Sequence, residues 1–243
     1  MSPTSSLALV GVLFGGLAAF CLYWTFELAA QGRWLSMLVV LGFAMFALAA
    51  LGVRIVVTLG KVAPRVQLVD GATELRPGIL VDRLSTTAAL AAFAAMLLYG
   101  VGGLLGVAGL PGVTGDRTWL PLVGIVGVLV GLPSVWRIAR QRGMGCVRLR
   151  SDGVDVADAY FRAGRRWDEL TEVSDRSAQS NWFQTSGVTY LTTADGHTRT
   201  WASDWYTPEG RTAREFVRFY WQHPEHRDEL TDSRAVRRLE AMT

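Results

Sequence analysis

Three histidines are the side chains in this sequence best suited to metal or acid–base chemistry, and two of them form a short motif. His223 and His226 flank Pro224 in the run His-Pro-Glu-His, whereas His197 stands in a separate turn segment. Two histidines three residues apart can bind zinc, but a zinc site needs additional Cys, His or carboxylate ligands. No cysteine or third histidine is near in the sequence, and Arg227 follows directly. We therefore interpret the three as surface histidines and predict no metal site.

A wider search of the sequence finds no catalytic constellation. There is no Walker loop, no dinucleotide-binding fingerprint and no nucleophile elbow. The central parts of the long apolar segments hold no Asp, Glu, Lys or His, which proton relays and many ion pathways require. The sequence thus predicts neither an enzyme nor a transporter acting alone, and it predicts no cofactor.

Arginine is the residue type whose distribution points to a ligand. The chain has 23 Arg but one Lys, and after the last apolar segment the arginines crowd together at Arg137, Arg140, Arg142, Arg148 and Arg150. Each basic residue beside an anionic leaflet contributes about 1 kcal/mol of attraction. Two interpretations stay open: the cluster binds anionic lipid headgroups, or it serves only to set the membrane topology.

Small residues and one aromatic pair are candidates for contacts with a partner protein. Glycines four residues apart let helices approach closely, and three such pairs stand in apolar segments: Gly11/Gly15, Gly102/Gly106 and Gly127/Gly131. These pairs serve either packing within the chain or docking to another membrane protein. We expect the docking residues to be Gly102, Gly103, Gly106 and Gly109, together with Trp182 and Phe183 in a polar loop.

Four long apolar segments must position these residues. They cover about residues 7–27, 34–54, 85–110 and 119–137, each long enough to cross a hydrocarbon core of about 30 Å. The first could instead be a secretory signal, but its leading residues lack Lys and Arg and its apolar run is long for such a signal. We therefore predict a four-span membrane domain over residues 1–142, with a polar loop at 60–84.

Charge asymmetry predicts the orientation of these spans. Ten Lys and Arg residues lie near the span ends on the side that holds the 60–84 loop and the Arg137–Arg150 cluster, against Arg33 and Arg117 on the other side. Basic residues favour the cytoplasmic side. The sequence therefore predicts a multi-pass protein of the bacterial inner membrane with both termini in the cytoplasm.

Beyond Arg142 the apolar period changes to two, which is typical of strands. We expect strands at 146–150, 154–160, 166–173, 188–193 and 198–202, with a turn at Arg162-Ala163-Gly164. Asp70-Gly71 predicts a short hairpin inside the 60–84 loop. A helix over 209–222 should place Phe216, Val217 and Tyr220 against the sheet, leaving Arg218 without a structural role. The tail at 224–243 is polar and could be helical at its end.

A meander of antiparallel strands closed by one amphipathic helix resembles the pleckstrin-homology-like (PH-like) domains of bacterial membrane proteins. The resemblance covers residues 143–223 and depends on Asp152-Gly153-Val154, on Trp167-Asp168-Glu169-Leu170 and on the closing helix. The loop after the first strand carries Asp152 where phosphoinositide-binding members hold basic residues, so the resemblance does not extend to that ligand. The predicted fold class is an α-helical four-helix membrane bundle plus an α+β PH-like cytosolic domain.

The combination of four spans and a PH-like domain, in a chain rich in Arg and Ala, resembles small actinobacterial accessory proteins, including subunits of mycobacterial Mce-type lipid importers. The resemblance implies a non-enzymatic accessory or scaffold subunit whose partners are other integral membrane subunits. The alternative is a sensor of anionic phospholipids that acts through the PH-like domain and the arginine cluster. Neither hypothesis involves nucleic acid.

Overall fold

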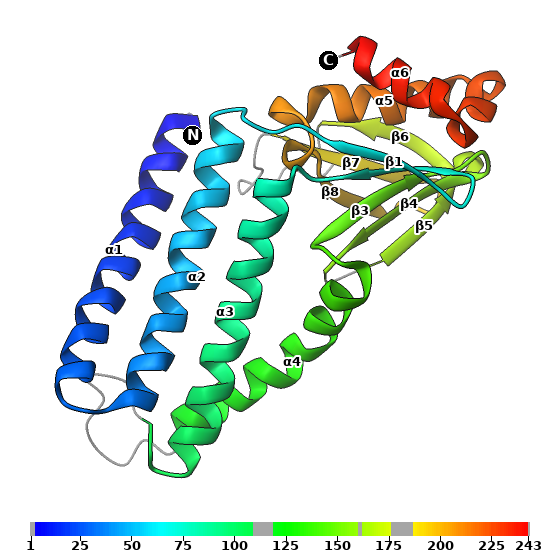
Figure 1. The fold of residues 1–243 in the computed structure, drawn as a ribbon. Coiled ribbons are helices and arrows are strands. Elements are labelled where there is room, and N and C mark those ends of the chain that lie inside the picture. The colour runs from blue at the N-terminus through cyan, green and yellow to red at the C-terminus, as the bar shows by residue number, and fades with distance from the viewer. Residues whose placement is uncertain (1–2, 109–118, 160–161, 176–186, 243) are drawn as a thin grey trace. The chain divides into compact units, whose positions relative to one another are not determined.

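The computed structural model describes residues 3–108, 119–159, 162–175 and 187–242. It divides the chain into two compact units, which are treated separately below. The first unit contains Met1–Ile55 and Arg83–Met144, and the second contains Val56–Asp82 and Gly145–Thr243. Figure 1 shows the elements of both units.

The first unit is helical. Its helices are α1 (Pro3–Ala30), α2 (Trp34–Thr58), α3 (Ile79–Leu104) and α4 (Trp119–Gln141), and the ends of α2 and α3 extend into the second unit. All four are long and apolar enough to cross a membrane. The four predicted spans are therefore confirmed as helices. The third helix begins and ends earlier than the expected 85–110, because Asp82 and Arg83 lie within its first turns and Gly106 follows its end at a φ of 70°.

Contacts between neighbouring helices hold the first unit together. On α1, Cys21 and Leu28 pack with Val40 and Ala44 of α2 in one buried cluster. The rings of Phe14 and Phe46 meet edge to face nearby, with centroids 5.9 Å apart. Apolar side chains of mixed size thus mediate the α1–α2 contact.

The second unit is an α+β domain with two antiparallel sheets. The five-stranded sheet has the order β1 (Arg65–Val69), β2 (Ala72–Arg76), β3 (Gly145–Leu149), β4 (Gly153–Asp158) and β5 (Arg162–Arg166). The three-stranded sheet has the order β6 (Leu170–Ser174), β7 (Val188–Thr193) and β8 (Thr198–Ala202). Each strand therefore pairs with its predecessor in the chain, except at the step between the two sheets.

Of two segments in this domain, one forms as the sequence predicts and joins the sheet, and the other differs from the prediction. The hairpin inside the 60–84 loop does form, and β2 pairs with β3, with Leu75 opposite Val147. The hairpin is thus part of the sheet, although α3 and α4 separate it from β3 in the chain. The expected turn at 162–164 is wrong, because Arg162–Arg166 forms β5 and pairs along its length with β4. The strand has a weak sequence signal, because the Arg, Ala and Gly at these positions do not strongly favour β structure.

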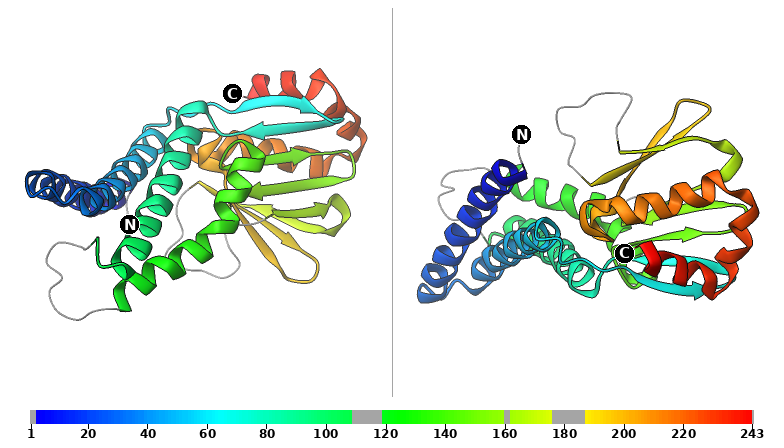
Figure 2. Two further views of the ribbon diagram at one scale, coloured as in Figure 1. Left: turned by 60° about the horizontal axis from the view of Figure 1, so that its bottom comes forward. Right: turned by 90° about the horizontal axis from the view of Figure 1, so that it is seen from above.

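Helices at the carboxyl end complete the core. They are α5 (Arg211–Gln222), the 3-10 segment η4 (Pro224–Thr231) and α6 (Ser233–Met242), and Figure 2 shows α5 lying across the strands. Phe216, Val217 and Tyr220 are fully buried in one cluster with residues of both sheets, as predicted. Leu230 and Leu239 are buried in the same cluster. The helical end of the tail is therefore confirmed, and the tail is part of the core of the second unit.

Candidate functional site

The glycines of α3 that were expected to dock a partner lie close to other parts of the same chain. A Cβ on Gly103 would stand 2.7 Å from Pro121 of α4, and one on Gly102 would stand 2.7 Å from Ala108. Gly106 lies beyond the helix and ends it, because its N–H donates to the Gly103 carbonyl at 3.1 Å in left-handed backbone geometry. Gly102 and Gly106 therefore do not form a helical pair.

The glycines of α4 also lie close to other residues of the same chain, on α3. A Cβ on Gly124 would lie 2.9 Å from the Met96 carbonyl oxygen and 3.0 Å from the Gly100 Cα. A Cβ on Gly131 would lie 3.2 Å from the ring of Phe93. The glycines on α4 thus let its backbone approach that of α3, which is the packing use of such spacings.

On α1, the glycines with the same four-residue spacing have free space beside them among the described residues. Ideal Cβ atoms on Gly11 and Gly15 would meet no heavy atom of the described residues within 4 Å. Leu13 and Leu17, which lie on the opposite side of the helix by the 3.6-residue period, are exposed as well. Among the predicted glycine pairs, Gly11/Gly15 is therefore the one that presents small surface outward.

The arginines of the predicted headgroup cluster have different surroundings. Arg140 and Arg142 are exposed at the end of α4, and Arg137 is half-buried on the same helix. In the second unit, Arg150 is exposed at the turn between β3 and β4. These arginines remain candidates for contact with an anion.

Arg148 differs, because its guanidinium is held by a buried carboxylate. Arg148 Nε donates to Glu74 Oε2 at 2.5 Å, and Arg76 Nε donates to Glu74 Oε1 at 2.5 Å. Glu74 is 1% exposed. Strand register places Glu74, Arg148 and Asp155 in one row across β2, β3 and β4. Opposite charges in directly facing positions stabilise strand pairing, so the role of Arg148 here is to join β2 to β3.

Electrostatics agree with this geometry. Burial by itself would raise the pKa of Glu74, but the hydrogen bonds from Arg148 and Arg76 outweigh it and lower the pKa. Glu74 is therefore a charged carboxylate at neutral pH, neutralised by its two arginines. Such a group is held too firmly, and is too well paired, to act as a general base.

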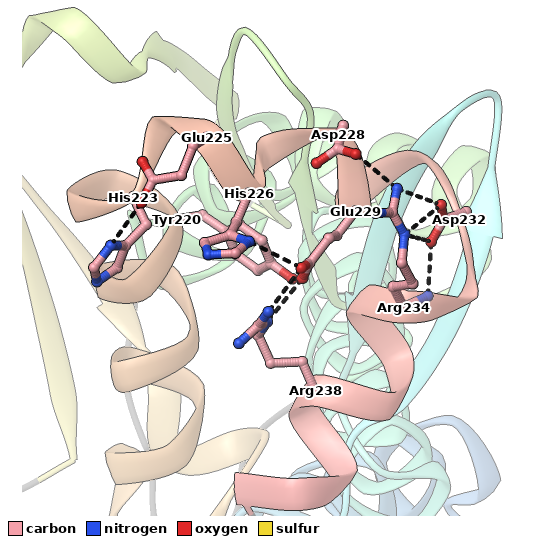
Figure 3. Close-up of polar contacts among 9 residues, drawn as sticks. All are labelled: Tyr220, His223, Glu225, His226, Asp228, Glu229, Asp232, Arg234 and Arg238. Atoms are coloured by element: carbon pink, nitrogen blue, oxygen red, sulfur yellow. Dashed lines mark hydrogen bonds and ion pairs between the residues drawn. The ribbon is translucent and has the colours of Figure 1, made fainter.

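A second carboxylate organises the carboxyl end, as Figure 3 shows. Glu229 accepts hydrogen bonds from both Nε and Nη2 of Arg238, each at 2.7 Å, and from the Tyr220 hydroxyl at 3.2 Å. His226 Nδ1 lies 3.1 Å from Glu229 Oε1. The paired arginine lowers the pKa of Glu229 to about 2. These contacts join η4 and α6 to α5.

The two histidines of the His-Pro-Glu-His motif belong to the same region. His223 Nδ1 lies 3.2 Å from Glu225 Oε1, and both imidazole rings lie against Phe219, with centroids 4.7 and 5.4 Å away. Throughout the described ranges, no group of three or more His, Cys, Asp or Glu residues is arranged to hold a metal ion. The geometry assigns the motif to packing at the end of α5.

Three predicted docking residues lie outside the described residues: Gly109, Trp182 and Phe183. Sequence reasoning, for its part, missed Glu74 and Glu229. An acidic residue in a β-rich segment or a polar tail looks solvent-exposed, and only the register and the fold reveal its arginine partners.

No family model matches this sequence, and neither the comparison with curated proteins nor that with solved structures found a significant match.

Proposed function

We propose that this chain is a non-enzymatic accessory subunit of a larger bacterial inner-membrane complex, a lipid-transport system of the Mce type, and that α1 is its docking helix. The observation that carries the proposal is the open Gly11/Gly15 face. Helices associate in membranes through close backbone approach at small residues, because lipid leaves no hydrophobic drive between apolar helices. The glycines of α4 already have their neighbour within the chain, whereas those of α1 do not.

The open glycine face adjoins the contact of α1 with α2. One side of α1 holds the chain together through Cys21, Leu28 and Phe14. By the 3.6-residue period, Gly11 and Gly15 lie beside Phe14 and the buried Ala18, at the border of this contact, where no described atom would meet a Cβ on either glycine within 4 Å. The Mce assignment itself comes from the resemblance of the four-span, PH-like architecture, and the α+β domain with its meander of strands closed by α5 is compatible with it.

The test is co-purification of the tagged full chain from its native membranes, followed by mass spectrometry. Replacing Gly11 and Gly15 with Leu adds bulk on the open face and should remove the partner subunits while leaving the chain inserted and folded. The matched control is Leu13→Phe with Leu17→Phe, which adds bulk on the opposite side of α1. Retention of all partners by Gly11→Leu/Gly15→Leu would rule out this face as the docking surface.

The proposed orientation places both termini and the α+β domain in the cytoplasm, on the basis of the arginine asymmetry. Single cysteines at Ser151 and at Thr114, in a background lacking Cys21 and Cys146, provide a test with a membrane-impermeant maleimide on intact cells. Residue 114 should label from outside and residue 151 only after lysis. The reverse pattern would overturn the orientation.

The alternative function, sensing of anionic phospholipids, is favoured by the exposed guanidinium groups of Arg140 and Arg142 at the end of α4. Native mass spectrometry of the purified chain distinguishes the two functions. A stoichiometric protein partner supports the accessory role. Retention of phosphatidylglycerol by the bare chain, lost in Arg140→Gln/Arg142→Gln, supports the sensor.

A further inference from the structure

Strand β5 forms one edge of the five-stranded sheet, and the structure describes a partner on one side of it only. Its residues pair with β4 from Gly153 opposite Arg166 to Ala157 opposite Arg162. Gly164, Arg165 and Arg166 are three consecutive exposed residues. Exposure of consecutive residues means that neither face of the strand is covered at this point.

The hydrogen-bond parity identifies the backbone groups that face outward. Trp167 N–H donates to the Asp152 carbonyl at 3.2 Å, so this pair is of the hydrogen-bonded kind. Such pairs alternate along an antiparallel ladder, so Arg165 also bonds toward β4, whereas Gly164 and Arg166 direct their N–H and C=O groups away from it. The Arg166 N–H agrees with this parity, since it donates to Glu169 Oε2 at 3.3 Å.

Helices of this unit contact two other edge strands, β6 and β1. On β6, the Val173 carbonyl accepts two hydrogen bonds from Arg218, at 3.0 and 2.7 Å, and the Leu170 carbonyl accepts one from Trp221 at 3.0 Å. Helix α6 packs against β1, as Figure 2 shows. Exposed strand edges invite pairing with another chain, and on β6 the side chains of α5 occupy two of the carbonyls that such pairing would use.

Among the described residues, charged side chains are the protection found at the edge of β5. Arg165 Nη1 donates to the Gly164 carbonyl at 3.3 Å in an exposed position, and Arg166 pairs with Asp168 at 3.1 Å on the surface. A second copy pairing antiparallel about Gly164 would bring the exposed Arg165 and Arg166 of both copies into one short strand pair, and like charges close together destabilise such a pair. An extended strand with acidic side chains would meet the same arginines favourably. The basic sequence of β5 thus excludes its own copy and selects acidic partners.

We propose that the β5 edge binds an extended acidic segment of another protein by strand addition, centred on Gly164. The segment would exchange backbone hydrogen bonds with the outward groups of Gly164 and set its carboxylates beside Arg165 and Arg166. Glu169, which occupies the Arg166 N–H, would mark one end of the added strand. This site is independent of the α1 face, so either can fail without the other.

The test uses the full chain in detergent micelles and a fluorescent, end-blocked peptide that alternates glutamate with valine, read by fluorescence anisotropy. Gly164→Pro removes the outward N–H without breaking the β4 ladder, a position at which an edge strand tolerates proline. Gly164→Ala is the matched control: its Cβ would lie 4.0 Å from Asp155, an ordinary contact, and the N–H remains. Binding should weaken at least about tenfold in the proline variant and stay unchanged in the alanine variant.

Four further results complete the test. A lysine–valine peptide should not bind, and Arg165→Gln/Arg166→Gln should weaken the acidic peptide. Equal binding by the Gly164→Pro and Gly164→Ala variants, with unchanged thermal midpoints, would show plain charge attraction and overturn strand addition. Absence of acidic-peptide binding to the unaltered chain would overturn the proposal as a whole.

Discussion

Buried carboxylates held by arginines are the residues that carry most structural information in the second unit. Glu74 joins β2 to β3 through Arg148, and Glu229 joins η4 to α6 through Arg238. From the sequence alone, Arg148 belongs to the basic cluster after the last span, and Glu229 belongs to a polar tail. Arg148 lies 74 residues from Glu74, and strand register brings the two together. Arg238 lies nine residues from Glu229, and the turn of the chain between η4 and α6 brings that pair together.

Stability of the second unit should depend on the charge of Glu229. Its pKa falls from an ordinary 4.5 to about 2 in the fold, so the stabilisation is complete above about pH 4.5 and is lost as the pH falls toward 2. Glu229→Gln should lower the free energy of unfolding at pH 7 by about 1–3 kcal/mol. The difference from the unaltered chain, measured by thermal unfolding across this range, should shrink below pH 4.5. A difference that does not vary with pH would contradict the assignment.

Arg218 should also contribute to stability, contrary to the prediction from the amphipathic pattern. Its two hydrogen bonds satisfy the Val173 carbonyl at the edge of β6. Arg218→Ala leaves this carbonyl unpaired and should destabilise the fold by about 1–3 kcal/mol. Arg211→Ala, on the same helix, is the control, because Arg211 is exposed and forms only a long contact with Glu209, at 3.8 Å. Equal thermal midpoints for the two variants would argue against the edge-covering role.

At the scale of elements, the sequence predicts more than it does at the scale of residues. The four spans, the two hairpins and the buried face of α5 follow from apolar periodicity and turn residues, which are local signals. The sequence does not show whether a glycine face packs within the chain or docks to another protein, because the four-residue spacing is the same in both cases. The backbone approach of Gly124 to Gly100 distinguishes α4 from α1.

The α3–α4 contact should therefore be the one that glycine substitution breaks. Gly124→Leu places a side chain against the Met96 carbonyl and the Gly100 backbone, which cannot move as a flexible side chain would. Overpacking of this kind destabilises by about 1–3 kcal/mol. Thermal unfolding of the purified chain in detergent measures the effect, with Gly16→Leu on the open part of α1 as the control. Equal loss in both variants would mean that bulk in any helix is harmful, whatever its neighbour.

At the scale of the molecule, the α+β domain is discontinuous in the chain. The hairpin β1–β2 lies between α2 and α3, and β3 follows α4. Leu75 of β2 is fully buried in the core, and Thr73 donates its hydroxyl hydrogen to the Leu230 carbonyl at 2.8 Å. Composition places the domain boundary after the last span because it cannot show that a short polar loop pairs with a distant strand.

A polypeptide of residues 145–242 alone should therefore not fold. A fusion of Arg65–Arg76 through a short Gly/Ser turn to residues 145–242 should fold, because Leu75 pairs with Val147 and the turn has little distance to cover. Circular dichroism and cooperative thermal unfolding measure the outcome, with a fusion carrying Leu75→Asp as the control. Cooperative unfolding of 145–242 alone, at the midpoint of the fusion, would show that the hairpin is dispensable.

Because the domain is discontinuous in the chain, its strands are synthesised at different times. The chain leaves the ribosome from its amino end, so β2 is made before the two helices that separate it from β3. Between Arg76 and Gly145 lie 145 − 76 = 69 residue steps, which take about 3–14 s at about 5–20 residues per second. During that interval α3 and α4 are still being synthesised, so Leu75 and Glu74 lack the strand β3 that later pairs with β2. Of the row across β2, β3 and β4, only Glu74 has been made by then, and Arg76 of the same strand is its available partner. The charges of these two side chains favour a solvated hairpin during the interval, and Glu74 pairs with Arg148 once β3 has been made.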